Sequence, residues 1–225
     1  MMVSEPPAHA SPSAPTAEPA APFPWPPQSG EPFTEAAGRT WRQSVFQPAS
    51  FFREMPRGSA ARAALLYYVM LGILVEGIHL FWRFILGPPS LEMLPGNELL
   101  RDFGGGANPL TPFLLSPLYL LLAVLLTAAV SHAFLAVLRG GAHGFRTTLS
   151  VFCFAYGPAL LAVIPRIGAP IGGVWMLVIA IIGLREAHGT TGAKAAAAVL
   201  GPMFLAFTIA FVMLLIAMAG ILGGV

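Results

Sequence analysis

Two apolar runs flank a polar segment of twelve residues in residues 171–222, which read IGGVWMLVIAIIGLREAHGTTGAKAAAAVLGPMFLAFTIAFVMLLIAMAGIL. The polar segment, residues 183–194, contains Arg185, Glu186, His188 and Lys194. A helix needs about 20 mostly apolar residues to cross the hydrocarbon of a bilayer. The apolar run before the polar segment begins at Ile167 and approaches that length, and the run after it exceeds it. The stretch therefore predicts two membrane-crossing helices joined by a polar turn.

The composition of the whole chain supports the same class of protein. Hydrophobic residues make up 56% of it, charged residues only 10%, and the mean hydropathy is +0.74. A soluble domain has about a quarter charged residues. So few charges cannot cover a water-facing surface, which indicates an integral membrane protein. The net charge of +2 is too small to suggest nucleic-acid binding, and the one cysteine, Cys153, cannot form an intrachain disulfide.

Five segments are apolar and long enough to be membrane spans. They are residues 61–86, 112–138, 147–164, 167–184 and 195–222, together a transmembrane region over residues 61–222. Gly157-Pro158 interrupts the third span, and Gly201-Pro202 lies near the start of the fifth. The backbone groups freed by Pro158 and Pro202 need partners on neighbouring helices, which favours a compact bundle. We therefore predict an all-α polytopic bundle of five transmembrane helices.

The N-terminal region divides into two parts. Residues 1–38 are rich in proline and alanine and predict a disordered cytoplasmic tail. Residues 39–58 predict an amphipathic interfacial helix, broken at Pro48. Its helical stripe and flanking arginines would lie at the membrane interface; an amphipathic helix that packs under the bundle is the alternative. The residues expected at the interface are Trp41, Val45, Phe52, Met55, Arg42 and Arg53.

The distribution of lysine and arginine predicts the orientation in the membrane. With the N-terminus in the cytoplasm, nine of these residues face the cytoplasm and three face outward or lie at an outer span end. The nine are Arg39, Arg42, Arg53, Arg57, Arg62, Arg139, Arg146, Arg185 and Lys194, and the three are Arg83, Arg101 and Arg166. Five crossings then place the C-terminus outside.

Several short motifs resemble the Yip family of five-pass membrane proteins. They are FQPASFFREMPRG before the first span, GFRTT at residues 144–148 and AYGP at residues 155–158, followed by IPRIGAPIGGVWMLVIAIIGLREAHGTTGAKAAAAVLGP. The resemblance covers residues 47–222 and is closest to a compact prokaryotic form. It implies the five-pass fold, a bacterial cytoplasmic membrane, and neither catalytic residues nor cofactors. Eukaryotic members interact with Ypt/Rab GTPases, but a bacterium has no prenylated Rab system for such binding.

The first span carries three ionisable residues at helical spacing. Glu76, His79 and Arg83 fall on one face, and each charge near the bilayer centre costs roughly 2.5–3.5 kcal/mol. This face should therefore point into the bundle or a wet cavity, with His132 of the second span as a natural partner. Either the group fixes helix packing, or it forms a proton or cation path or a headgroup site. The spacing does not match the HExxH zinc motif, so no metal is expected.

The polar turn has two interpretations. Arg185, Glu186, His188 and Lys194 could contact a protein partner at the cytoplasmic face, or the turn could simply be polar. Motifs such as GxSxG and the phosphate-binding loop are missing, so we expect no enzyme. We predict a non-enzymatic membrane protein that organises membrane or recruits protein partners. The alternative is a small ion, proton or solute transporter or channel that uses the polar face of the first span. Gly168 and Gly172 would permit close helix contact within the chain or in a homo-oligomer.

Overall fold

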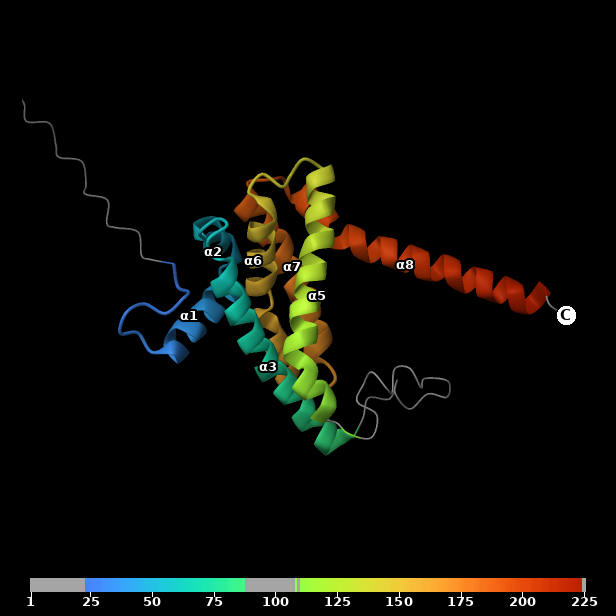
Figure 1. Cartoon of the computed structure of the whole chain (residues 1–225), viewed down its shortest axis with the longest axis horizontal. Helices are drawn as coiled ribbons and strands as arrows, with labels where there is room; N and C mark the ends of the chain where they lie inside the picture. The colour runs from blue at the N-terminus through green and yellow to red at the C-terminus, as the bar shows by residue number, and fades with distance from the viewer. Residues whose placement is uncertain (1–22, 88–107, 109, 224–225) are drawn as a thin grey trace, which may run out of the picture.

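The structure is a computed structural model that describes residues 23–87, 108 and 110–223. Within these residues the regular structure is helical throughout. Residues 1–22 of the predicted tail and Arg101 of the orientation count lie outside the described residues. Figure 1 shows a bundle built from α3, α5, α6 and α7, with α1 and α2 on its flank and α8 running away from it.

Among the residues that the structure describes, five helical segments are long and apolar enough to cross a membrane, which confirms the predicted fold class. The first is α3 (Ala61–Leu86) and the second is α5 (Leu110–Val137). The third span, Gly144–Val163, consists of α6 (Gly144–Ala155) and the 3₁₀ helix η2 (Gly157–Val163). The fourth is α7 (Gly168–His188), and α8 (Gly192–Gly223) contains the fifth, Gly192–Met213.

The third span occupies the centre of the bundle. Its α6 part packs against α3, α5 and α7, and Val151, Cys153 and Phe154 are fully buried. The α-helix ends just before Gly157-Pro158, because a proline has no N–H to continue the hydrogen-bond ladder. The break converts the rest of the span to a tighter helix, which packs closely on α7.

One end of the bundle collects most of the described basic residues. The α5–α6 and α7–α8 connections meet there, and α3 begins there (Figure 1, top). We call it the basic end, defined by Arg53, Arg57, Arg62, Arg139, Arg146, Arg185 and Lys194. Arg83 and Arg166 lie toward the opposite end, where α3 finishes and α7 starts.

The amphipathic segment forms two helices, α1 (Phe33–Phe46) and α2 (Pro48–Glu54), which meet at Pro48. Val45, Phe52 and Met55 are at most 5% exposed, because this stripe packs into the core of the protein. The Trp41 indole donates to the carbonyl oxygen of Gly157 (2.9 Å), while Arg42 is exposed. The apolar stripe therefore lies against the bundle, which is the arrangement of the predicted alternative.

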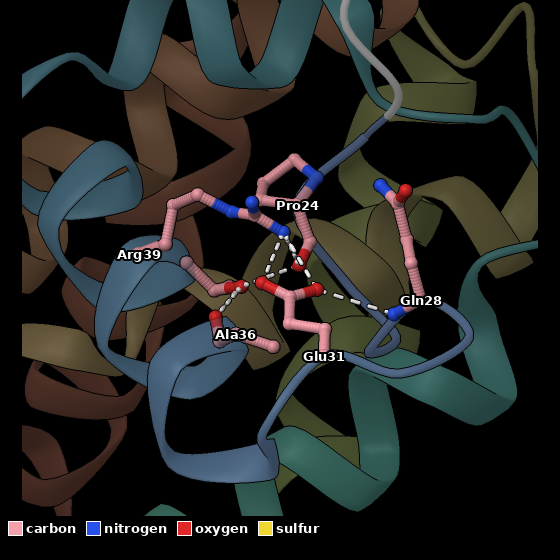
Figure 2. A network of polar contacts seen from close by, with 6 residues as sticks. Pro24, Gln28, Glu31, Ala36 and Arg39 are labelled. Carbon is pink, nitrogen blue, oxygen red and sulfur yellow. Dashed lines mark hydrogen bonds and ion pairs between the residues drawn. The ribbon is translucent and has the colours of Figure 1, made fainter.

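Residues 23–38, which the composition assigns to the disordered tail, are folded onto the bundle. Trp25 is 2% exposed; its indole donates to the carbonyl oxygen of Ala63 at 2.6 Å. Figure 2 shows how this segment is tied to α1: Arg39 Nη2 donates to Glu31 Oε2 (3.0 Å). The Thr40 hydroxyl also donates to the Pro24 carbonyl (3.3 Å). The segment differs from the expectation because Trp25 occupies a buried site that composition does not reveal.

Helix α8 packs on the bundle only along its first turns. Ala195, Ala198 and Val199 are buried against α5 and α7. Beyond Gly201-Pro202 the helix extends away from the other helices (Figure 1). Its large apolar side chains from Met203 to Met213 are about half exposed or more. The close packing that we expected around Pro202 is thus limited to the base of α8.

Candidate functional site

A carboxylate and an imidazole form the polar site of the first span. Glu76 Oε2 lies 3.7 Å from His79 Nδ1, one helical turn along α3. The Tyr119 side chain of α5 lies close enough to Glu76 for the two groups to interact. The Glu76 side chain is 18% exposed and that of His79 is 43% exposed. Arg83, half-buried, follows one turn further along α3. The site joins α3 to α5 and leaves His79 accessible from the side of the bundle.

His132 belongs to a different site at a different depth. Glu76 lies 15 residues after Ala61, where α3 begins, or about 22 Å along the helix axis at 1.5 Å per residue. His132 lies only 5 residues before Val137, where α5 ends, or about 8 Å from that end. The two side chains therefore do not form the pair that the sequence suggested. Hydropathy assigns a residue to a span but does not set its depth relative to another span.

Three histidines and a threonine form a cluster at the basic end. His132 Nδ1 lies 2.9 Å from Thr148 Oγ1, which lies 2.9 Å from His188 Nε2. The backbone N–H of His143 donates to His188 Nδ1 (3.3 Å). We name these four residues the histidine cluster. It connects α5, α6, α7 and the α5–α6 turn.

The hydrogen bonds define the direction of donation within the histidine cluster. Because His188 Nδ1 accepts from a backbone N–H, a neutral His188 carries its proton on Nε2 and donates to the Thr148 hydroxyl. The Thr148 hydroxyl then donates to His132 Nδ1. Both nitrogens of buried His188 and the hydroxyl of buried Thr148 thus have partners, which is the arrangement that stabilises buried polar groups. Thr148 was not singled out as a site residue, although it lies in the GFRTT motif.

The residues of the predicted polar turn divide between surface and interior. Helix α7 continues to His188, which is 3% exposed and therefore cannot contact a partner directly. Glu186 accepts from Arg53 Nε of α2 (3.0 Å) and from Arg185 Nε (3.0 Å). Lys194 lies in the first turn of α8, where its backbone N–H reaches the Thr191 hydroxyl (3.4 Å). The turn itself is reduced to the residues after His188.

The donor groups of these sites do not gather around one point. Across residues 23–87, 108 and 110–223, no three His, Cys, Asp or Glu side chains come together in a way that could hold a metal ion.

Comparison with known proteins relates most of the chain to one family. The family model described as the Yip1 domain matches residues 42–215. No curated protein and no solved structure matches the chain. The matched region begins within α1, includes all five candidate spans and ends within α8.

Proposed function

Because the chain belongs to the Yip1 domain family, we propose that this multi-pass membrane protein recruits protein partners at its basic end and performs no catalysis. In this proposal the bundle is a scaffold that holds a surface in place. The basic end faces the cytoplasm of a bacterial inner membrane, in keeping with the positive-inside rule. The C-terminus then lies on the other side.

The observation that carries this proposal is a set of exposed arginines at the basic end. Arg57, Arg62, Arg139 and Arg146 are all exposed, and none has an ionic partner among the described residues. Arg53 differs, because it pairs with Glu186 and anchors α2 to α7. A surface with this charge complements an acidic protein surface, and charge complementarity mainly accelerates and orients association.

The internal polar groups support a scaffold more than a passage. The Glu76–His79 pair and the histidine cluster lie at different depths: Glu76 contacts His79 and Tyr119, whereas the hydrogen bonds of the histidine cluster join His132, Thr148, His143 and His188. An ion path would need polar groups that connect these two levels. The partly exposed Glu76–His79 pair remains the feature that favours the second candidate, a proton or ion transporter.

Site-specific photo-crosslinking in cells tests partner recruitment. A crosslinking amino acid at Ala142 would sample the basic end, and one at Val163 would sample the opposite end; both positions are exposed. We expect protein adducts from position 142 that fall several-fold when Arg139→Glu and Arg146→Glu are combined. The same adducts from position 163, or adducts that are insensitive to charge reversal, would contradict the proposal.

Flux measurements in proteoliposomes separate the two candidates. We expect the wild-type chain to carry no more proton or cation flux than empty vesicles, and the Glu76→Gln and His79→Ala variants to behave alike. Flux that appears with the wild type and disappears in both variants would establish the transporter instead.

A further inference from the structure

An apolar groove of about 890 Å³ lies between α1, η2 and the first half of α7. Its walls include Trp41, Phe46, Pro158, Ile171, Val174 and Trp175. Phe46, Ile171 and Val174 are 56–66% exposed, so the groove opens to the surroundings of the protein. Its volume falls in the range of sites that bind small organic ligands, about 300–1,000 Å³. We call it the α1–α7 groove.

The indole N–H groups of the two tryptophans are both hydrogen-bonded within the protein. Trp41 Nε1 donates to the Gly157 carbonyl (2.9 Å), and Trp175 Nε1 donates to the Val45 carbonyl (3.3 Å). Each bond ties an indole to the backbone of a neighbouring element, which holds the walls of the groove in place. What remains for a ligand is a hydrocarbon wall, which suits an alkyl chain and offers nothing to hydrogen-bond a polar molecule.

The groove lies at the depth of the membrane interior. Its walls on η2 and α7, residues 157–163 and 170–175, lie within the third and fourth candidate spans, in the half of each span that faces away from the basic end. A groove that opens sideways at this depth meets the acyl chains of the surrounding bilayer. The groove therefore faces lipid, whereas an apolar patch on a soluble domain faces water and has no particular apolar ligand beside it.

An arginine without an ionic partner stands beside the groove. Arg42 precedes Phe46 by four residues on α1, so the two side chains share a helical face. Arg42 is exposed and forms no ion pair with the described residues. Arg42 follows Trp41, whose indole donates to Gly157 within the third candidate span, so this arginine lies beside the spans, where a charge is costly unless an anion accompanies it. A lipid phosphate is an anion that arrives already attached to an acyl chain.

We propose that the α1–α7 groove binds one acyl chain of an anionic membrane phospholipid, and that Arg42 neutralises the phosphate of that lipid. The hydrocarbon wall holds the chain, and the guanidinium selects the negatively charged headgroup. The lipid would also cover the outer face of α1, which otherwise presents polar residues beside the spans.

Native mass spectrometry of the full-length protein tests the proposal. The protein is first placed in vesicles of equal phosphatidylglycerol and phosphatidylcholine with the same acyl chains, then released in mild detergent. We expect the wild type to retain one phospholipid, with phosphatidylglycerol in excess. The groove-filling variants Val174→Trp and Ile171→Phe should lose it. Leu126→Trp is the matched control, since Leu126 is 67% exposed on α5 and lies off the groove.

The Arg42→Gln variant tests the headgroup separately. We expect it to keep a bound lipid but to lose about five-fold in its preference for phosphatidylglycerol, the effect of one basic residue near an anionic surface. An unchanged preference would overturn the role of Arg42. Equal retention by the wild type and both groove-filling variants would overturn the binding site, as would equal loss in the Leu126→Trp control.

Discussion

At the scale of single residues, Thr148 is a fully buried polar residue whose hydroxyl contacts two histidines. Its hydroxyl is fully buried and bridges His132 and His188 with two bonds of 2.9 Å. A hydroxyl can donate one hydrogen bond and accept others. Thr148 can therefore accept the bond from His188 Nε2–H and donate to His132 Nδ1, which a group that only donates could not do. The residue thereby links α5 and α7 through α6.

Replacing Thr148 with valine removes this bridge and keeps the shape of the side chain. We expect a loss of about 1–3 kcal/mol in unfolding free energy, because buried His188 is left with an unsatisfied Nε2–H. Reversible unfolding in mixed micelles with increasing sodium dodecyl sulfate measures the loss. Thr148→Ser keeps the hydroxyl and should retain most of the stability. Equal stability of the valine variant and the wild type would show that the bridge contributes nothing.

At the scale of elements, the contact between η2 and α7 depends on glycine. A Cβ added at Gly172 would lie 2.6 Å from the Pro158 carbonyl oxygen, and one added at Gly168 would meet the Leu161 carbonyl. Both obstacles are backbone atoms, which cannot rotate aside. The sequence suggested that these glycines permit close helix contact within or between chains, and the structure uses both within the chain. The close approach turns the chain back at Pro165 and brings Trp175 to α1.

Two neighbouring glycines of α7 provide a matched pair for testing this contact. We expect Gly172→Ala to destabilise the protein by about 1–3 kcal/mol, since overpacking forces backbone shifts. Gly173→Ala has no atom within 4 Å of the added Cβ. It should leave stability unchanged or raise it by up to about 1 kcal/mol, as alanine suits a helix better. The same detergent titration measures the unfolding free energy of both variants. Similar effects of the two changes would mean that the η2–α7 approach is not tight.

At the scale of the whole molecule, the protein consists of a packed helical bundle and one lone helix, the outer part of α8, that extends away from it. The third span is enclosed by α3, α5 and α7, while the outer part of α8 leaves the bundle (Figure 1). In a bilayer the lone helix needs no protein partner, because its exposed apolar side chains are compatible with lipid. The segment of residues 23–54 wraps the side of the bundle, so the protein has a lateral face made of short helices as well as spans.

Labelling of engineered cysteines tests the orientation of the whole molecule. Ala142→Cys places a thiol at the basic end, and Arg166→Cys places one at the opposite end; both positions are exposed. In intact cells of a bacterial host, after the outer membrane is opened, we expect an impermeant maleimide to label position 166 only. Position 142 should react once the inner membrane is opened. The unmodified chain is the control, because Cys153 is buried. Labelling of position 142 in cells with an intact inner membrane would show that the protein has the opposite orientation.

Much of the fold can be predicted from the sequence because hydropathy acts locally. The third span breaks at Gly157-Pro158 as the sequence predicts, and the predicted span of residues 61–86 matches α3. Prediction was least successful where a side chain depends on its partners. Thr148 resembles any threonine in an apolar run, and Trp25 resembles any residue in a proline-rich tail. Their roles exist only because Ala63, His132 and His188 are brought to them.

The sequence by itself determined that this protein is a membrane protein with five candidate spans of the Yip1 type, because an apolar run of about 20 residues has few other stable environments. Only the tertiary structure decided which polar side chains meet. Depth and rotation of each helix arise from packing against its neighbours, and these placed Glu76 with Tyr119 and His132 with Thr148. The same packing laid α1 across the third and fourth spans and left a hydrocarbon groove beside Arg42.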